Sequence, residues 1–432
     1  SRGDRLVRWL LFVGIASIYV ATLSGITSSN DGSHYALLRT MIANRTFALR
    51  QFDDYAEGND IAIVEDTLYS DRPPGNAMTA VPFYLLGQLL PEAPSPLPSR
   101  HDAGNLALFW VLLLPVLAGV GTVLLLYTLL RRLRVSLAAA FLTAVFFALG
   151  TIHWKYSTVF FSHALSSLLV LASVVLSLWP ENHPYANWSR YALLGFLLGW
   201  AVVVEYANGL LVVVAALFVL WSLPDYNGRT LRYTILPFIV TGLLPALFLA
   251  FYNTTNFGGP FTLSYAFASN YPWAGQFSTT FNFPLQDGLR ALLWFGSGDG
   301  WCGGDCLNQG VFLLSPIMLL ALPGLWFYYR ADRRAFLFTT AVFLIYLLLF
   351  ARHRTFHGFT ADGRYLAPFL SLLALPAGFA VDALWRQMRR ETMPWLPVIV
   401  LVFGLFFLSL RNMALHIATS FNYTLDLTQL HP

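Results

Sequence analysis

Two short motifs near the amino end carry residue types suited to transfer chemistry. Asp31 follows the first apolar stretch, in the run Ser-Ser-Asn-Asp-Gly-Ser-His-Tyr, and the string Asp-Arg-Pro-Pro-Gly covers residues 71–75. A carboxylate at the edge of a bilayer loses water on one side, which raises its pKa and suits a general base. Arg72, held on a stiff proline arm, can bind a phosphate in bidentate fashion. The simpler interpretations are a helix cap for Asp31 and a turn before a helix for Asp71 and Arg72.

Four further candidates lie close to ends of apolar stretches. His34 and Tyr35 stand three and four residues after Asp31, so on a helix they share its face. Lys155, the only lysine, is a candidate phosphate contact, and His163 follows one turn into the next apolar stretch. A histidine inside a span can simply bond a neighbouring helix, but ionisable groups in spans are functional by default.

An acid and a basic patch complete the set of candidates. Glu205 divides one long apolar run, so it marks either a plain helix-to-helix turn or a wall of the same site. Arginines are disfavoured on the external face of a membrane, so a cluster there suggests an anionic ligand. The candidates from this patch are Arg354, His357, Arg364 and Tyr365.

The composition places these residues on a membrane protein. The chain has 432 residues, of which 57% are hydrophobic and 11% charged, and its mean hydropathy is +0.59. Apolar runs long enough to span predict an all-α polytopic protein with about eleven transmembrane helices. These are residues 6–27, 105–130, 136–151, 158–179, 190–204, 207–223, 232–252, 309–329, 335–351, 365–385 and 395–412.

The run 78–90 is too short to cross a bilayer, and we predict a juxtamembrane helix there. With this run excluded, the arginine clusters fall on one side, which by the positive-inside rule is cytoplasmic. The amino end is then cytoplasmic, and the loops 28–104 and 253–308 are external. All the candidate residues lie on the external face. The net charge of +4 is a topology signal and does not indicate nucleic-acid binding.

Cys302 and Cys306 are the two cysteines, and two glycines lie between them. This spacing permits a small disulfide-closed loop or two free thiols on an oxidising face. Zinc would need two further ligands, and Asp299 and Asp305 are poor substitutes. We therefore expect no metal site at these cysteines.

The order of these motifs resembles the GT-C superfamily of polytopic glycosyltransferases. The nearest branch is the family 39-like one, with bacterial relatives of protein O-mannosyltransferases and aminoarabinose transferases. Asp31 matches the catalytic acid of the first external loop, and residues 71–75 match the acid/basic-Pro-Pro string. Residues 313–324 and 357–368 resemble the late Ser-Pro and Gly-x-Arg-Tyr-Leu-x-Pro patterns. Many members have two adjacent acids where this chain has Asp31 followed by Gly32.

The resemblance implies a polyprenyl-phosphate sugar as donor and a lipid, glycan or protein hydroxyl as acceptor. Asp31 would take the proton of the acceptor hydroxyl as that hydroxyl attacks the anomeric carbon, with inversion. The leaving phosphate would be stabilised by Arg72, Lys155, Arg364 and Arg354. The remaining candidates would contact substrate: His34, Tyr35, Asp71, His163, Glu205, His357 and Tyr365. The family also permits a divalent cation near Asp31 or Asp71.

The resemblance further implies a bacterial cytoplasmic membrane location and one catalytic module over residues 1–385. Residues 386–432 would then form the last span and an external tail. Two other functions fit the composition: a non-catalytic subunit of a larger membrane complex, and a transporter. The transporter is the weaker alternative, because the spans contain few polar residues and no internal repeat is visible.

Overall fold

The computed structural model describes residues 2–90, 106–179, 188–223, 227–297, 307–356, 358, 360, 362–390 and 394–420. The chain folds into two compact units, each assembled from segments that are distant in sequence. Unit 1 contains Ser1–Leu23, Val116–Thr158 and Phe281–Pro432, and unit 2 contains Ser24–Pro115 and Val159–Thr280. Each unit is described by itself.

The loop predicted to be external at residues 28–104 contributes to unit 2, and its described part, residues 28–90, is largely regular. Its elements are helix α2 (Ser29–Ala43), the 3-10 helix η1 (Arg50–Ala56), strands β1 (Ile61–Val64) and β2 (Thr67–Ser70), and helix α3 (Gly75–Gln88). The strands pair antiparallel, with Ile61 opposite Ser70 and Val64 opposite Thr67. Two prolines precede α3, and Pro74 is its N-cap. Proline has no backbone N–H, and it is tolerated at the start of a helix because the first N–H groups there have no partner within the helix. A helix is thus present where one was expected at 78–90, although it runs from Gly75 to Gln88, and its place beside the membrane stays a prediction.

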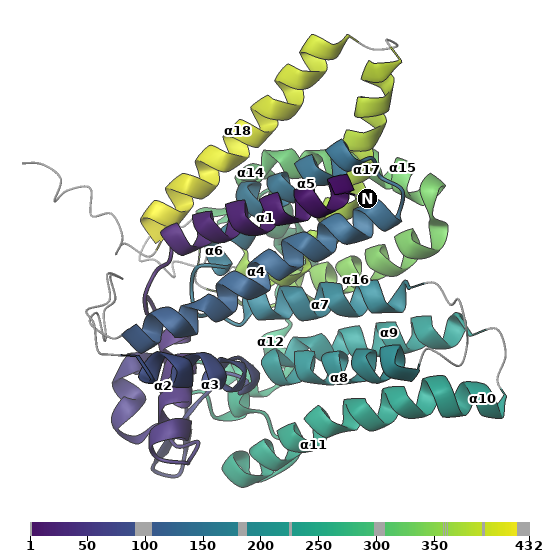
Figure 1. Cartoon of the computed structure of the whole chain (residues 1–432). Coiled ribbons are helices and arrows are strands. Elements are labelled where there is room, and N and C mark those ends of the chain that lie inside the picture. The colour runs from purple at the N-terminus through teal and green to yellow at the C-terminus, as the bar shows by residue number, and fades with distance from the viewer. Residues whose placement is uncertain are drawn as a thin grey trace, which may run out of the picture. The chain divides into compact units, whose positions relative to one another are not determined.

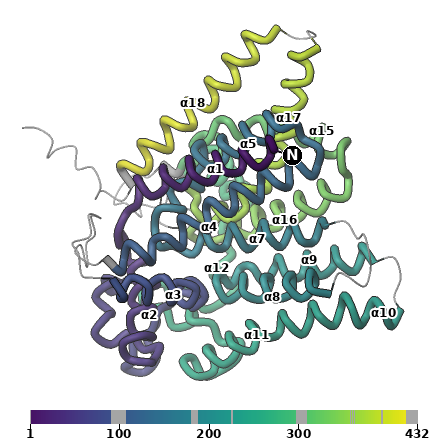
Figure 2. The backbone as a smooth tube through the Cα atoms, in the orientation of Figure 1, coloured from purple at the N-terminus to yellow at the C-terminus, as the bar shows by residue number. Residues whose placement is uncertain are grey.

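Apolar helices form the rest of unit 2. They are α7 (His163–Ser177), α8 (Trp188–Val204), α9 (Gly209–Trp221) and a continuous helix made of α10 (Gly228–Thr230), η3 (Leu231–Ile235) and α11 (Leu236–Phe257). Helices α8 and α11 lie side by side (Figures 1 and 2). Gly195 allows this approach, because a Cβ atom there would stand 2.0 Å from the carbonyl oxygen of Phe238.

The part of the second predicted loop that belongs to unit 2, residues 258–280, packs back onto the first loop. It holds the short helices η4 (Ser264–Phe267), η5 (Pro272–Gly275) and α12 (Phe277–Thr280). Ala268 forms an isolated bridge with Ala62, and the Ser269 N–H donates to the Ile61 carbonyl at 3.0 Å. Strand β1 therefore has a partner on each side, which fixes the hairpin against the second loop.

Unit 1 begins with α1 (Arg2–Ala21), the end of α4 (Leu106–Arg132), α5 (Leu137–Gly150) and the short helix α6 (His153–Tyr156). Polar contacts join these segments: the Tyr19 hydroxyl donates to the Ala148 carbonyl at 2.9 Å. The His153 ring stacks on Phe147 with centroids 4.4 Å apart. These contacts hold α6 against the apolar core of unit 1.

The later part of the chain supplies the remaining helices of unit 1. In order, they are α13 (Leu285–Leu293), strands β3 (Phe295–Ser297) and β4 (Leu307–Gln309), α14 (Val311–Leu314), η6 (Pro316–Leu320), α15 (Ala321–Ala331), α16 (Arg333–Ala351), η7 (Arg364–Phe369), α17 (Leu370–Arg389) and α18 (Trp395–Ser420). Helix α17 is buried over most of its length. Its Phe379 stacks on Tyr328 of α15 at 4.6 Å, which helps to hold these neighbouring helices together.

The chain is an α-helical multi-pass membrane protein. Among the described residues, five helical stretches are long and apolar enough to cross a membrane: Ala107–Arg132, Gly228–Phe257, Arg333–Ala351, Arg364–Arg389 and Trp395–Ala418. Shorter apolar helices cover other expected spans, and the total of eleven stays a prediction. The expected span 6–27 ends early, because α1 stops at Ala21. There the Thr22 hydroxyl donates to the Ile18 carbonyl and closes the last turn.

The close approach of α8 and α11 gives a first prediction. Gly195→Ala should lower the free energy of unfolding by about 2 kcal/mol, since the new methyl group would collide with backbone. Gly404→Ala on α18 is the matched control, because a Cβ atom added there would have nothing within 4 Å. It should leave stability unchanged or raise it slightly. Thermal unfolding in detergent measures both, and equal melting temperatures would contradict the packing argument.

Candidate functional site

The carboxylate of Asp31 is fully buried and accepts four hydrogen bonds at the start of α2. One oxygen accepts from the Thr27 N–H at 2.8 Å and the Thr27 hydroxyl at 3.1 Å. The other accepts from the Ser28 N–H at 2.8 Å and the Ser28 hydroxyl at 2.7 Å. Ser28 is the N-cap, and Asp31 occupies the third helical position of a capping box. The helix begins at Ser29, so Asp31 lies inside its first turn and is not itself the N-cap residue.

Two opposing effects set the pKa of Asp31. Burial raises it above its ordinary value, and the hydrogen bonds from Thr27 and Ser28 oppose that rise. The next residue is necessarily small, because a Cβ atom at Gly32 would stand 1.8 Å from the Tyr55 carbonyl oxygen. The second acid found in many resembling proteins has no room at this position.

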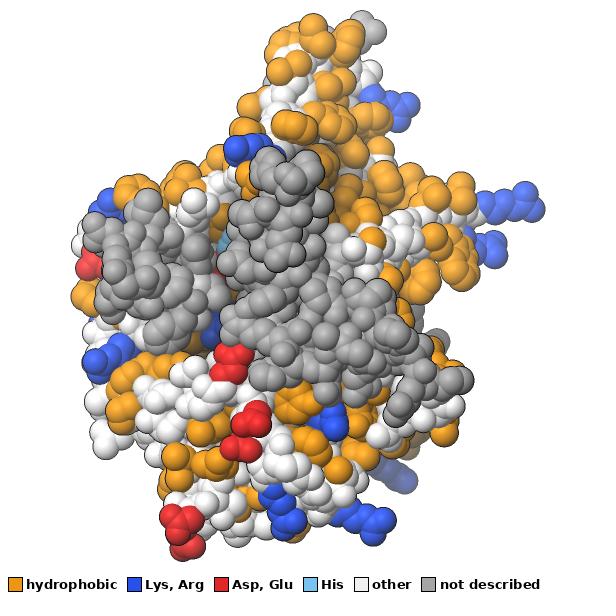
Figure 3. All heavy atoms as spheres, turned by 90° about the vertical axis from the view of Figure 1, so that its left-hand side faces the viewer, with side chains coloured by type: hydrophobic (Ala, Val, Ile, Leu, Met, Phe, Trp, Pro, Cys, Tyr) orange, Lys and Arg blue, Asp and Glu red, His pale blue; other side chains and the backbone are white. Residues whose placement is uncertain are grey.

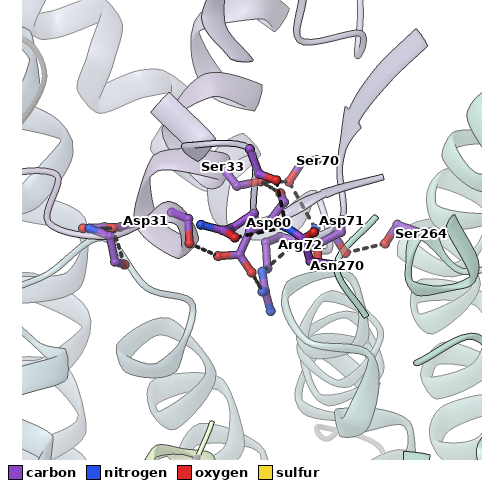
Figure 4. Close-up of polar contacts among 12 residues, drawn as sticks. Asp31, Ser33, Asp60, Ser70, Asp71, Arg72, Ser264 and Asn270 are labelled. Atoms are coloured by element: carbon purple, nitrogen blue, oxygen red, sulfur yellow. Dashed lines mark hydrogen bonds and ion pairs between the residues drawn. The ribbon is translucent and has the colours of Figure 1, made fainter. Parts of the chain in front are cut away.

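Arg72 lies between two carboxylates of the same loop (Figure 4). Its terminal nitrogen donates to Asp60, and its Nε atom is 3.1 Å from a carboxylate oxygen of Asp71. The side chains of Asp60 and Asp71 are 6% and 1% exposed. Two carboxylates and one guanidinium give this cluster a net negative charge. Arg72 therefore offers hydrogen-bond donors without a net positive charge around them. Figure 4 shows Asp31 lying apart from this group.

Hydroxyl groups join the arginine cluster to α2 and to the second loop. Ser29 donates to the Asp60 carboxylate, and Ser33 donates to the Asp60 carbonyl at 2.6 Å. The Ser264 hydroxyl donates to the Asp71 carbonyl at 2.6 Å (Figure 4). Three separate segments of unit 2 are thereby anchored around Arg72.

His34 and Tyr35 point to different surroundings, although they are neighbours. His34 is buried, and its ring lies 6.1 Å from that of Phe160. Burial, followed by the charge of Arg72, lowers the pKa of His34 to about 3, so the imidazole is neutral at neutral pH. Tyr35 instead packs edge-on against Tyr55 at 5.2 Å. Of the two residues, His34 is therefore the one that lies near Arg72. Contact of either residue with substrate stays a prediction.

His163 begins α7, and Glu205, just after the end of α8, lies in the same neighbourhood of unit 2. The Ser162 hydroxyl, next to His163 in sequence, donates to the Glu205 carboxylate at 2.9 Å. Burial raises the pKa of Tyr265, and the negative charge of Glu205 adds to that rise. Glu205 is thus a half-buried acid that interacts with the second loop, and its place in a substrate site stays a prediction.

Lys155 of unit 1 belongs to a buried ionic cluster. Its ammonium donates to the Asp362 carboxylate at 2.7 Å and lies 3.1 Å from the Nε2 atom of His416. His416 Nε2 is itself 2.8 Å from the same Asp362 oxygen, and the Tyr156 hydroxyl donates to that oxygen at 2.9 Å. Burial favours a raised pKa for Asp362, but Lys155 and His416 outweigh it and hold the pKa well below its usual range.

The other candidates of the basic patch also lie in unit 1. Arg364 is buried and forms a cation–π contact with the ring of Tyr365 at 5.7 Å. Tyr365 stacks on Phe350 at 5.2 Å. Arg354 is exposed. His357, like Cys302 and Cys306, lies outside the described residues.

Three partners were missed when the sequence was considered alone. Asp60 stands before a short strand with no motif around it, although it contacts Arg72. Asp362 lay in the basic patch, but no pattern linked it to Lys155. His416 is a single histidine near the end of the last helix. None of these carries a local signal, because the contacts with Lys155 join residues 207 and 261 positions apart.

The described residues contain no group of three or more His, Cys, Asp or Glu side chains placed to hold a metal ion. Near Asp71, the acids Asp60 and Asp71 are already engaged by Arg72. A divalent cation near Asp31 or Asp71 stays a prediction. Acids of the first loop also reach the surface, and red side chains mark acids on the face shown in Figure 3. The exposed ones among the described residues are Asp54, Glu57, Glu65 and Asp66.

Comparison with solved structures identifies the class of fold. A crystal structure of ArnT from Cupriavidus metallidurans bound to undecaprenyl phosphate matches with a TM-score of 0.55 and 15% identity, over 96% of this chain and 75% of that one. The apo state of the same protein gives 0.55 and 14%, over 96% and 74%. An Archaeoglobus fulgidus oligosaccharyltransferase tethered with an acceptor peptide gives 0.54 and 12%, over 94% and 55%.

The chain therefore has the same fold as ArnT and as the archaeal oligosaccharyltransferase. It spans about half the length of the oligosaccharyltransferase and three quarters of the ArnT chain. No family profile and no curated protein matches it. At identities of 12–15% the likeness establishes the fold and leaves the reaction open.

The arginine cluster yields a second prediction. Asp60→Ala should reduce the free energy of unfolding by about 2 kcal/mol, because it breaks a buried ion pair while Asp71 still holds Arg72. Asp66→Ala is the matched control, since Asp66 is exposed on the same hairpin, and it should change stability by less than about 0.5 kcal/mol. Chemical unfolding in detergent compares the two. Equal effects would show that the cluster contributes no stability.

Proposed function

We propose that this protein is a membrane glycosyltransferase that moves a sugar from a polyprenyl-phosphate donor to an acceptor hydroxyl at the external face. The observation that carries the proposal is the GT-C fold, in which the ArnT structure holds undecaprenyl phosphate. The buried acids and the arginine of the first loop add chemical support. The acceptor is a lipid, a glycan or a protein.

In the proposed reaction Asp31 is the general base. The acceptor oxygen forms a bond to the anomeric carbon as the bond from that carbon to the phosphate oxygen breaks. The hydroxyl proton passes to Asp31, and the polyprenyl phosphate leaves as an anion. A single displacement without a covalent sugar–enzyme intermediate inverts the anomeric centre. Burial supports this role, since it raises the pKa of Asp31 and makes the carboxylate a stronger base.

The hydrogen bonds of Asp31 limit how it can accept a proton. Four donors already face its two oxygens. The two backbone N–H groups are fixed by the helix start, whereas the hydroxyls of Thr27 and Ser28 can rotate away. We propose that the acceptor hydroxyl takes the place of one of these hydroxyls.

The phosphate contacts are proposed separately for each unit. In unit 2, the guanidinium of Arg72 has more N–H donors than its contacts with Asp60 and Asp71 use. The remaining donors would bind the phosphate. In unit 1, Arg364 and Lys155 are buried cations beside a single carboxylate, so their cluster keeps a net positive charge. Arg354 adds an exposed charge. We further propose a bacterial cytoplasmic membrane location with a cytoplasmic amino end, on the arginine pattern alone.

Sugar transfer by purified protein in nanodiscs tests the base. Over a panel of labelled polyprenyl-phosphate sugars, wild type should consume one donor and Asp31→Asn should be slower by about a hundredfold or more. Because burial raises the pKa of Asp31, wild-type activity should be lost as pH falls through a value above 3.8, the ordinary pKa of aspartate.

Ser28→Ala is the matched control. It removes one hydrogen bond of the cap and should cost about 1 kcal/mol of stability while activity stays within about threefold of wild type. If both variants lose stability equally and neither loses transfer, Asp31 serves the helix cap and is not the base.

A second function is favoured by that same cap. A carboxylate whose acceptor sites are all used has a sufficient structural reason to be present. In that case the chain would be a non-catalytic GT-C subunit of a membrane complex. Folded wild type that consumes no donor and co-purifies with other membrane proteins would support this alternative.

A further inference from the structure

Three titratable groups of unit 1 form a compact triangle that includes the only lysine of the chain. Lys155 Nζ and one oxygen of Asp362 are 2.7 Å apart, and His416 Nε2 is 2.8 Å from that oxygen and 3.1 Å from Nζ. The side chains of Lys155, Asp362 and His416 are 1%, 0% and 12% exposed. Each group is therefore held by the other two and is largely shielded from water.

His416 can complete this triangle in two ways. With a proton on Nε2, the ring donates to Asp362; without one, the ring nitrogen accepts from the Lys155 ammonium. In both cases the imidazole restrains a lysine side chain whose four-carbon stem is otherwise flexible. The Tyr156 hydroxyl also donates to Asp362, and Arg364 adds a positive charge nearby.

Helix α18 carries His416 on a polar stripe along an otherwise apolar helix. Ser409 accepts from the Ile317 N–H at 2.9 Å, and Asn412 donates to the Leu313 carbonyl at 3.0 Å. Residues 409, 412 and 416 are spaced by three and four, so they share one helix face. Many other positions of α18 are exposed, as Phe407 at 66% illustrates, although Val402 and Met413 are buried. Its polar contacts within unit 1 are thus concentrated near the triangle.

We infer that His416 is a positioning residue that, through Asp362, fixes the Lys155 ammonium for contact with the donor phosphate. The last helix then belongs to the working transferase, whereas the sequence placed it outside the catalytic module. This inference rests on the proposed function in one respect, namely that Lys155 meets a phosphate. The restraint of Lys155 by His416 does not depend on it.

Amine labelling tests the restraint directly, because Lys155 is the only lysine. Acetylation of the intact protein in nanodiscs is followed by mass spectrometry of the peptide that contains Lys155. His416→Ala should raise the acetylation rate about fivefold or more, since local opening becomes easier. It should also raise the donor KM about tenfold, as expected for one lost hydrogen bond to a charged group, with kcat changed less than about threefold.

Two further variants separate positioning from mere docking of the helix. His416→Gln keeps a side-chain N–H and should restore most of the wild-type protection and KM. Asn412→Ala removes a different contact of α18, one turn earlier, and should leave both values within about twofold of wild type.

The outcomes distinguish the inference from the proposed function. Unchanged labelling in His416→Ala, or an equal rise in Asn412→Ala, would overturn the positioning role. A rise in labelling without any change in KM would overturn the phosphate role of Lys155. If wild type transfers no sugar but His416→Ala still exposes Lys155, the proposed function fails and the restraint by His416 stands.

Discussion

A charge that folding removes from water needs an opposite charge beside it, and this constraint organises both units. Arg72 is held by Asp60 and Asp71 in unit 2, and Lys155 is held by Asp362 in unit 1. Breaking such a pair leaves a buried charge alone, which is far more costly than losing a surface pair. The pairs also join distant segments, since Lys155 and Asp362 are separated by 207 positions. The elements that carry candidate chemistry are therefore fixed by the charges themselves.

The two clusters differ in charge balance, and this difference bears on what each can bind. In unit 2 two carboxylates surround one guanidinium, so the cluster has excess negative charge. In unit 1 a single carboxylate faces Lys155 with Arg364 nearby, so positive charge remains. An anion is attracted by the second balance and gains only hydrogen bonds from the first. The cationic cluster of unit 1 is thus the stronger electrostatic partner for a phosphate.

The sequence predicted those features of the structure that depend on residues close together in the chain. Apolar runs located most of the long helices, and the helix predicted from residue 78 begins at Gly75, directly after the two prolines. The acid and arginine at positions 71 and 72 were found because they adjoin a rigid string. Asp60 and His416 were missed, since their partners come from tertiary contacts that no spacing encodes. The role of Asp31 was left open for the same reason, because neighbouring residues can make either a cap or a base and only the geometry shows four bonds.

Capping and base catalysis by one carboxylate are physically coupled. A protonated carboxyl becomes a donor at one oxygen, so at least one of the four groups that face Asp31 must lose its acceptor. The backbone N–H groups of Thr27 and Ser28 cannot turn away without unwinding the first turn of α2, whereas their hydroxyls can. Proton uptake would therefore loosen a hydroxyl first and keep the helix start intact. The Ser28 hydroxyl, at 2.7 Å, makes the shorter of the two hydroxyl bonds, so the Thr27 hydroxyl at 3.1 Å is the one that yields more readily.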